Sequence, residues 1–143
     1  MAHTYDYPRP MVTVDCLIFN NLKAIPRILL IQRKNPPFEG LWALPGGFIE
    51  MDETLMESAL RELKEETGIR LKKLKQIHVF GDPGRDPRGR TISVAFIGFV
   101  AKELPAVAAD DAAKADWFPI DQLPELAFDH TEIIRLGIER KLN

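Results

Sequence analysis

The sequence predicts a mixed α/β or α+β domain, and three observations lead to this prediction. Apolar β-like runs follow one another along the chain, an amphipathic helix with clear end signals lies in the middle, and helical periodicity returns near the C-terminus. At 143 residues the chain has the commonest size of a single domain, so we expect residues 1–143 to form one unit. Residues 1–10 are polar and contain two prolines, which predicts an extended arm.

The first part of the predicted sheet precedes the central helix. Met11–Phe19 and Ile28–Arg33 are apolar runs joined by two asparagines, a pattern typical of a β-hairpin. Residues 41–44 are expected to form a short strand that leads into a turn at residues 45–47. Glycine in that turn allows the backbone to approach a ligand closely or to adopt a positive φ.

The central helix is expected to run from about residue 55 to residue 66. Thr54 and Glu57 have the spacing of a capping box, which marks a helix start. Gly68 stands where a C-cap glycine is expected. A buried stripe at the spacing of three to four residues is predicted from Met56, Ala59, Leu60 and Leu63.

The rest of the chain continues the alternation of strands and loops. The expected elements are a strand at Leu71–Phe80, a loop at Gly81–Gly89, a strand at Arg90–Val100, a connection at Leu104–Ala115, a short strand or turn at Asp116–Pro119, and a helix at His130–Leu142. Cys16 lies within the first apolar run and is predicted to be buried core.

Three glutamates gather near the end of the central helix: Glu62, Glu65 and Glu66. Like charges at i,i+4 destabilise a helix by about 0.2–0.5 kcal/mol per pair, and negative charge at a helix C-terminus also opposes the macrodipole. A hard divalent cation would remove both penalties, because Mg²⁺ and Mn²⁺ favour carboxylate oxygens. Arg61, at i,i+4 from Glu65, can hold that carboxylate in place. The alternative is an ordinary solvated acidic helix face.

A longer pattern surrounds these glutamates. Residues 47–69 match G-x5-E-x7-R-E-U-x-E-E-x-G-U, where U is a bulky aliphatic residue, and its seven fixed positions are Gly47, Glu53, Arg61, Glu62, Glu65, Glu66 and Gly68. Such a match arises by chance about once in 10⁸ start sites. The segment resembles the Nudix box, and the order of elements resembles the Nudix α/β/α sandwich over the whole chain. The resemblance implies an α/β fold with a mixed β-sheet and a catalytic loop-helix. It also implies a hydrolase that uses a divalent metal to cleave a nucleoside diphosphate linked to another group.

The resemblance assigns roles within the box. It implies that Glu62, Glu65 and Glu66 bind one or more Mg²⁺ ions, with Mn²⁺ as a substitute. The carbonyl of Gly46 would add a ligand, and Glu53 would assist through water. Gly47 and Arg61 complete the implied site, the former against the substrate.

The general base has two candidate locations in the resemblance. It is either a box glutamate or an acid on a distal loop, where Asp110 and Asp111 are the candidates. A solvated acidic turn is the alternative role for these two aspartates.

The loop at Gly81–Gly89 bears on the substrate. Arg85, Arg88 and Arg90 are planar donors suited to phosphate or to stacking on a base; alternatively they form surface ion pairs with neighbouring aspartates. Pro83 and the surrounding segment resemble those of bacterial ADP-ribose pyrophosphatases. This resemblance implies cleavage of ADP-ribose to AMP and ribose 5-phosphate.

Further candidates for the nucleotide pocket are Arg33, Trp42 and Phe80, although aromatic residues at such positions are more often core. His78 and His130 have no metal-ligand spacing and are predicted to be structural.

Composition limits the partners. The net charge of −2 gives no general attraction to nucleic acid or to an anionic membrane. A single cysteine suits a reducing cytosol, and without a signal-like start or a long apolar stretch we expect a cytoplasmic protein. The family resemblance implies a homodimer with exchanged elements, in which Arg9 of the arm reaches the partner.

Two alternative functions stay open. The substrate is another nucleotide, such as a nucleoside triphosphate, a sugar nucleotide or a dinucleoside polyphosphate. Or the chain is a non-catalytic Nudix domain that senses ADP-ribose to regulate transcription. Sensors normally carry a C-terminal winged helix, which we do not expect here, and tend to lose box glutamates, which are all present.

Overall fold

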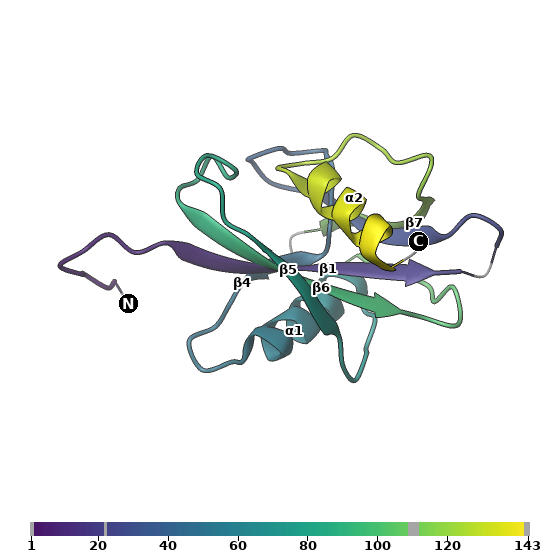
Figure 1. Cartoon of the computed structure of the whole chain (residues 1–143), viewed down its shortest axis with the longest axis horizontal. Helices are drawn as coiled ribbons and strands as arrows, with labels where there is room; N and C mark the ends of the chain where they lie inside the picture. The colour runs from purple at the N-terminus through teal and green to yellow at the C-terminus, as the bar shows by residue number, and fades with distance from the viewer. Residues whose placement is uncertain (1, 22, 109–111, 142–143) are drawn as a thin grey trace.

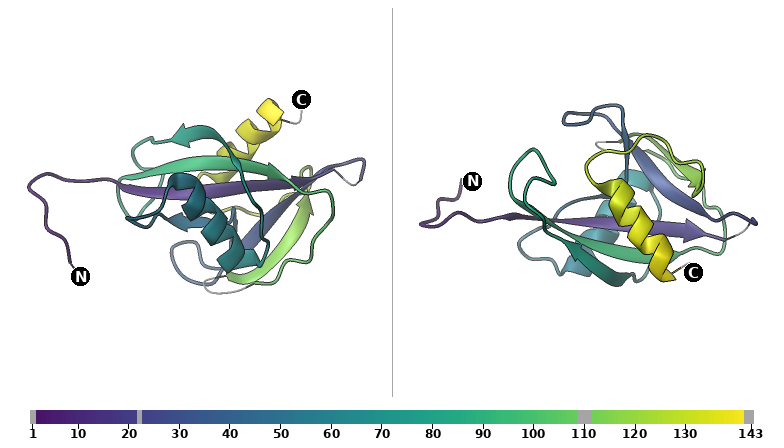
Figure 2. Two further views of the ribbon diagram at one scale, coloured as in Figure 1. Left: turned by 90° about the horizontal axis from the view of Figure 1, so that it is seen from below. Right: turned by 45° about the horizontal axis from the view of Figure 1, so that its top comes forward.

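The computed structural model describes residues 2–21, 23–108 and 112–141. The strands are β1 (Met11–Asn20), β2 (Arg27–Arg33), β3 (Trp42–Ala43), β4 (Gly46–Phe48), β5 (Lys75–Phe80), β6 (Thr91–Phe99) and β7 (Ala112–Pro119), and the helices are α1 (Leu55–Thr67) and α2 (His130–Lys141). The two helices lie on opposite faces of the sheet, and the N-terminal arm runs away from it (Figures 1 and 2). This arrangement confirms the predicted α/β/α sandwich.

The sheet is mixed and it forks. Its strand order is β3-β2-β1-β6-β5, with β1 and β6 parallel and the other pairs antiparallel. β1 and β2 pair at their hairpin end, where Phe19 faces Ile28 and Asn20 faces Arg27. Toward their other ends, β1 pairs with β4 and β2 pairs with β3. The two central strands therefore separate, and short strands line the opening between them.

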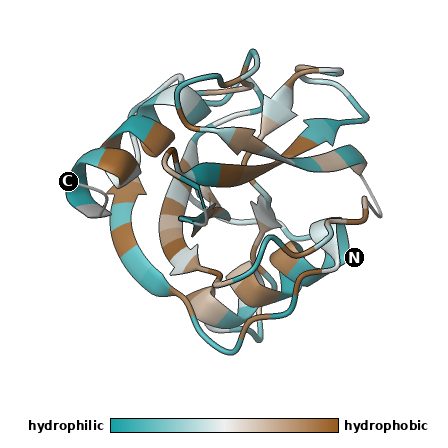
Figure 3. Ribbon diagram, turned by 90° about the vertical axis from the view of Figure 1, so that its right-hand side faces the viewer, coloured by the Kyte–Doolittle hydropathy of each residue, from teal (hydrophilic) through white to brown (hydrophobic). Residues whose placement is uncertain are grey.

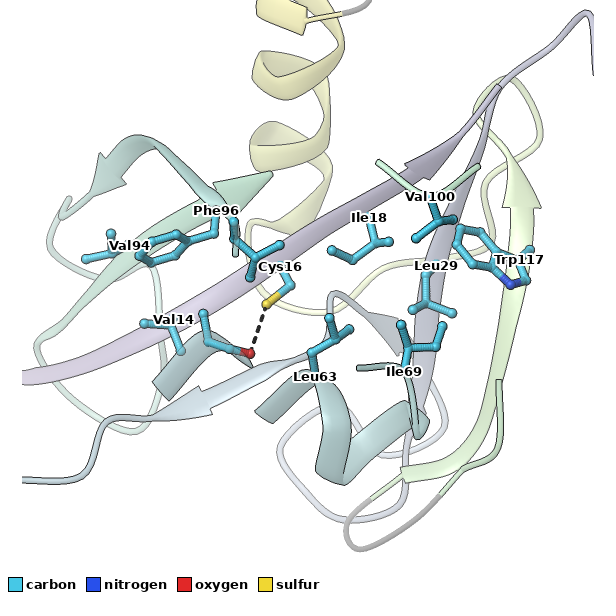
Figure 4. Close-up of a cluster of buried hydrophobic side chains, with 12 residues drawn as sticks. Val14, Cys16, Ile18, Leu29, Leu63, Ile69, Val94, Phe96, Val100 and Trp117 are labelled. Carbon is cyan, nitrogen blue, oxygen red and sulfur yellow. Dashed lines mark hydrogen bonds between the residues drawn. The ribbon is translucent and has the colours of Figure 1, made fainter. Parts of the chain in front are cut away.

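The core has two layers, because β1 is covered on both faces. Val14, Cys16 and Ile18 point toward α1, whereas Leu17 and Phe19 point toward α2. The thiol of Cys16 is fully buried and donates to the carbonyl of Ala59, as drawn in Figure 4. Burial, with smaller contributions from nearby carboxylates, raises the pKa of this thiol. The prediction that Cys16 is core is confirmed.

Helix α1 begins and ends as the sequence predicts. The side chain of Thr54 accepts from the N–H of Glu57, and the side chain of Glu57 accepts from the N–H of Thr54, which completes a capping box. At the other end Gly68 adopts φ 76° and donates to the carbonyl of Lys64. In Figure 3 both helices alternate hydrophobic and hydrophilic positions, as expected of helices packed on one side.

The prediction that Met56 belongs to the buried stripe of α1 is wrong. Ala59 and Leu63 are fully buried, but Met56 is 38% exposed. Met56 lies at the edge of the packed face, where its sulfur accepts from the N–H of Leu74. Glu66, by contrast, is only 7% exposed, so the buried face of the helix includes a carboxylate.

Three other boundaries differ from the prediction. The glycines expected in a turn form β4 instead, because they pair with β1. β5 begins at Lys75, since Leu71 and Leu74 pack into the α1-side core before the strand starts. β7 begins at Ala112 because that segment pairs with β2, so the predicted connection is wrong for residues 112–115.

The described residues contain no helix that is long and apolar enough to cross a membrane. Helix α2 begins at His130 as predicted, with Ile133 and Ile134 buried against the sheet; the predicted end at Leu142 lies outside the described residues.

Candidate active site

A cleft of about 520 Å³ lies in the opening between β1 and β2. Its walls come from β1, β2, β3 and β4, from the last turns of α1, from the loop between β5 and β6, and from the residues that precede α2. The volume falls within the range of about 300–1,000 Å³ that is usual for small-molecule sites.

Helix α1 presents its three glutamates to this cleft with increasing exposure. Glu66 is buried, whereas the side chains of Glu62 and Glu65 are 15% and 43% exposed. The N–H of Gly46 donates to Oε1 of Glu66 at 2.7 Å. This bond fixes the deepest carboxylate against β4 and satisfies it despite its burial.

Arg61 braces the other acidic side chains. Its Nε donates to both carboxylate oxygens of Glu53 at 3.0 and 2.9 Å, and its Nη1 donates to Glu62 at 2.8 Å and to Glu65 at 3.2 Å. Its Nη2 donates to the carbonyl of Phe48 at 3.1 Å. Burial alone would lower the pKa of Arg61, but the bonds to Glu53 and Glu62 outweigh it and raise that pKa. The guanidinium therefore stays charged and offsets the repulsion among the carboxylates.

Glu53 lies outside the lining of the cleft. Ser58 Oγ donates to it at 2.7 Å and Arg61 donates to both of its oxygens. The bond from Ser58 and then the bonds from Arg61 lower the pKa of Glu53. The structure thus gives this carboxylate a contact with Arg61; its assistance to a metal through water stays a prediction.

Gly46 and Gly47 are required by close packing. A Cβ on Gly46 would lie 2.0 Å from the carbonyl oxygen of Val14, and a Cβ on Gly47 would lie 2.7 Å from the carboxyl carbon of Glu62. Neither glycine has a positive φ, so that predicted reason is wrong for both. The close approach that the structure shows is to β1 and to Glu62, and the predicted approach to a ligand stays a prediction. Strand β4 can approach both β1 and α1 because these two residues lack side chains.

The donor set of the cleft fits a hard divalent cation. Glu62, Glu65 and Glu66 contribute carboxylate oxygens to one space. Across residues 2–21, 23–108 and 112–141, no three His, Cys, Asp or Glu side chains are grouped as a ready metal cage. Mg²⁺ normally takes only one or two carboxylates and completes its shell with water and substrate phosphate. The residues therefore suit an ion bound together with a phosphate ligand.

The predicted substrate residues Arg33, Gly47 and Arg85 line the cleft. Arg33 donates through Nε to the carbonyl of Pro37 at 2.7 Å, and its guanidinium lies 5.0 Å from the ring centroid of Phe128. Arg85 is held by Asp129, to which Nε and Nη2 donate at 2.9 and 2.6 Å. This bidentate pair fastens the β5–β6 loop to the start of α2.

Other predicted residues do not reach the cleft. Phe80 packs against the α2-side core, edge-on to His78 at 4.9 Å, and Arg90 is exposed just before β6. Strand β5 is separated from the opening between β1 and β2 by β6, so Phe80 lies away from the cleft. Trp42 packs edge-on against Phe118 at 4.7 Å in the same core. Asp110 and Asp111 lie outside the described residues.

Sequence reasoning missed a buried pair in the cleft. Asp15 is 6% exposed and accepts from Ser93 Oγ, and its Oδ1 lies 3.5 Å from Nε2 of His130. Nδ1 of His130 accepts from the N–H of Leu44 at 2.9 Å, which supports its predicted structural role. Burial lowers the pKa of His130 despite the nearby aspartates. The sequence signal that could have found this pair is the carboxylate of Asp15 in the middle of an apolar strand.

Arg88 and Asp86 also line the cleft. Asp86 is buried and accepts from the guanidinium of Arg88 at 2.8 Å, so the ion-pair alternative holds for this arginine. Burial would raise the pKa of Asp86, but the bonds from Arg88 outweigh it and lower that pKa. The guanidinium of Arg88 also lies over the rings of Phe48 and Phe128.

Comparison with known proteins agrees with this site. Residues 9–137 match the model of the NUDIX domain, so the chain belongs to the NUDIX domain family. It is 48% identical over 130 residues to an ADP-ribose pyrophosphatase from Methanocaldococcus jannaschii, an alignment that covers 90% of this chain and 73% of that protein. It is 37% identical to the ADPR responsive transcriptional repressor NtrR of Acinetobacter baylyi over 96% of this chain, and spans 57% of that longer protein. The NUDIX domain of Shewanella oneidensis NrtR, in a cocrystal structure with ADP ribose, superposes with a TM-score of 0.88 at 33% identity, covering 95% of this chain and 93% of that one.

Proposed function

We propose that this chain is a Nudix pyrophosphohydrolase that cleaves ADP-ribose to AMP and ribose 5-phosphate. The single observation that carries the proposal is the complete set of box glutamates, held by Arg61 and by the N–H of Gly46, beside a cleft of about 520 Å³. Two comparisons support the substrate: the Methanocaldococcus jannaschii relative is an ADP-ribose pyrophosphatase, and the Shewanella domain was crystallised with ADP ribose.

The proposed cofactor is Mg²⁺, with Mn²⁺ as a substitute. Glu62, Glu65 and Glu66 would hold it, with the carbonyl of Gly46 as a further ligand. A bound divalent cation would neutralise charge on the diphosphate and make a bound water more acidic.

The protein residues supply position and charge. Glu66 is anchored by the N–H of Gly46, and Arg61 keeps Glu62 and Glu65 at fixed positions on the cleft wall. Such fixed groups lower the barrier by orienting the diphosphate and the attacking water. Water attacks one phosphorus, and the bond from that phosphorus to the bridging oxygen breaks. We propose a box glutamate as the acceptor of the water proton, with Asp110 or Asp111 as the alternative.

A substrate panel tests this function directly. Product release is measured with Mg²⁺ for ADP-ribose, a sugar nucleotide, a nucleoside triphosphate and a dinucleoside polyphosphate. We expect ADP-ribose to lead by at least tenfold in kcat/KM, about 1.4 kcal/mol of discrimination. If another compound leads, the pyrophosphohydrolase assignment stands and the substrate assignment fails.

A second candidate is an ADP-ribose sensor, which the similarity to the Acinetobacter repressor favours. The complete box argues against it, because a sensor needs binding without turnover. Binding of DNA in a gel-shift assay, together with no turnover of any compound in the substrate panel, would establish the sensor function instead.

We also propose that the protein acts as a homodimer in the cytosol. The N-terminal arm exposes Tyr5 and Tyr7 at 46% and 80%, and a second copy of the chain would cover them. The buried, unpaired Cys16 is compatible with a reducing compartment. Light scattering of the purified protein distinguishes a monomer from a dimer.

A further inference from the structure

An aromatic pair lies at the cleft, next to the phosphate-binding wall. Phe48 follows Gly46 and Gly47 in β4, and Phe128 precedes α2. The guanidinium carbon of Arg88 lies over both rings, 4.8 Å from the centroid of Phe48 and 5.1 Å from that of Phe128. A planar cation thus already lies over two aromatic rings inside the cleft.

The backbone of Phe128 adopts an unfavourable conformation that holds its ring at the cleft. Its φ of 52° is unusual for a bulky side chain, and residues held this way tend to cluster at functional sites. Phe38 packs edge-on against the ring at 4.9 Å, and Arg33 lies 5.0 Å from its centroid. These contacts fix the ring at the cleft instead of allowing it to fold fully into the core, so Phe128 is preorganised to meet a ligand.

Phe48 is connected to the acidic wall. Its carbonyl accepts from Nη2 of Arg61, while its side chain is 41% exposed. A large apolar side chain left exposed in a pocket marks a binding surface. Phe48 therefore directly follows Gly47, which lines the cleft beside the proposed diphosphate site.

Arg88 is the third member of this group. Asp86 accepts from its Nε and Nη2, which holds the plane of the guanidinium. A fixed guanidinium stacks well on planar rings and also attracts phosphate.

We propose that Phe48, Arg88 and Phe128 form the nucleobase subsite, in which the purine of the substrate stacks on these side chains. The inference rests on the proposed function and adds where the base binds. Base–aromatic stacking supplies binding energy through the face of the ring, so removing one aromatic face weakens binding by about tenfold or more.

The test replaces the aromatic face and keeps the apolar bulk. Phe128→Leu and Phe48→Leu are expected to raise KM for ADP-ribose about tenfold while kcat stays within about twofold, and Phe128→Tyr is expected to bind like the wild type. If these phenylalanines only filled space, leucine would replace them without changing KM. Phe99→Leu is the matched control, because Phe99 is 47% exposed in β6 and outside the cleft lining, and its kinetics should not change.

Equilibrium competition separates the base from the rest of the substrate. Inhibition by AMP should weaken in Phe128→Leu, whereas inhibition by ribose 5-phosphate, which has no base, should be unchanged. Calorimetry with AMP in the presence of a chelator gives the same comparison without turnover. If Phe128→Leu loses its fold by circular dichroism, the exposed Phe48→Leu carries the test.

The outcomes distinguish the two proposals. Turnover of ADP-ribose with unchanged KM and AMP affinity in the leucine variants overturns the subsite and leaves the function standing. Absence of turnover in the wild type, with AMP binding that still depends on Phe128, overturns the function and leaves the subsite.

Discussion

Arg61 connects more of the site than any single glutamate does. One guanidinium contacts three carboxylates and a backbone carbonyl, so its loss would release side chains that repel one another. Arg61→Lys keeps the charge but cannot donate in so many directions. We expect the Mg²⁺ concentration for half-maximal activity to rise by about 10- to 100-fold, as for other residues that orient metal ligands. Metal titrations of the initial rate measure this, with Arg70→Lys on the exposed surface as the control.

A substitution at Glu66 can remove the negative charge of the side chain and keep its packing. Glu66→Gln keeps an oxygen that accepts from the N–H of Gly46, so the melting temperature should change little. The lost negative charge should lower kcat by at least about 100-fold if this carboxylate stabilises the transition state. Near-normal turnover would remove Glu66 from the reacting centre. Glu139→Gln, on the exposed face of α2, serves as the control.

His130 makes stability depend on pH. Because burial lowers the pKa of His130, the unfolded chain takes up its proton first as the pH falls. The free energy of unfolding should therefore decrease as the pH is lowered through about 6.5, the ordinary histidine range, and continue to fall until the folded-state pKa is reached. Urea denaturation between pH 8 and pH 5 measures the slope. His130→Gln should reduce the slope, and His3→Gln in the exposed arm should not; equal slopes in all three proteins would contradict the prediction.

At the scale of elements, local signals were sufficient for α1 and insufficient for β4. The capping box, the C-cap glycine and the spacing of the glutamates all lie within the helix sequence, so its bounds and its acidic face could be predicted. β4 is only three residues long and exists because β1 pairs with it. The start of β7 was missed for the same reason, since its alanines have weak strand preference and depend on β2.

The two glycines of β4 should respond differently to substitution. Gly46→Ala places a Cβ 2.0 Å from a backbone oxygen of β1, and backbone cannot easily move. Gly47→Ala places its Cβ against the flexible end of Glu62. We expect the first variant to lose about 1–3 kcal/mol of stability by overpacking.

The Gly47→Ala variant should keep most of its stability and lose activity, because the displaced group is the carboxylate of Glu62. Thermal denaturation and kcat measured on both variants check this pair of predictions. Equal stability losses in the two proteins would mean that β4 shifts as a unit.

At the scale of the whole molecule, the fork of the sheet brings together walls that the sequence keeps apart. Box residues were predictable because one helix carries them, but Asp15 meets His130 only after β1 and α2 are packed. Arg85 reaches Asp129 through the same packing. No local pattern encodes these distances, so the contacts of Asp15 with His130 and of Arg85 with Asp129 could not be predicted.

The proposed metal dependence would be a property of the assembled cleft. A chelator should abolish hydrolysis, and added Mg²⁺ or Mn²⁺ should restore it, because the carboxylates alone cannot neutralise a diphosphate. Circular dichroism should be unchanged by the chelator, since the described carboxylates are already satisfied by Arg61 and the N–H of Gly46. Activity that persists in excess chelator would rule out the metal mechanism.

The alternation of β1 has a consequence for how this strand tolerates change. Val14 and Cys16 support α1, whereas Thr13 and Asp15 face the cleft. Substitutions at successive positions of this segment therefore affect different properties. A change at Val14 or Cys16 affects folding and so the amount of protein, whereas a change at Thr13 or Asp15 affects the reaction. A saturation library across residues 13–16 is sorted separately for expression and for turnover. Positions 14 and 16 should be the more sensitive in the expression sort, and positions 13 and 15 in the turnover sort.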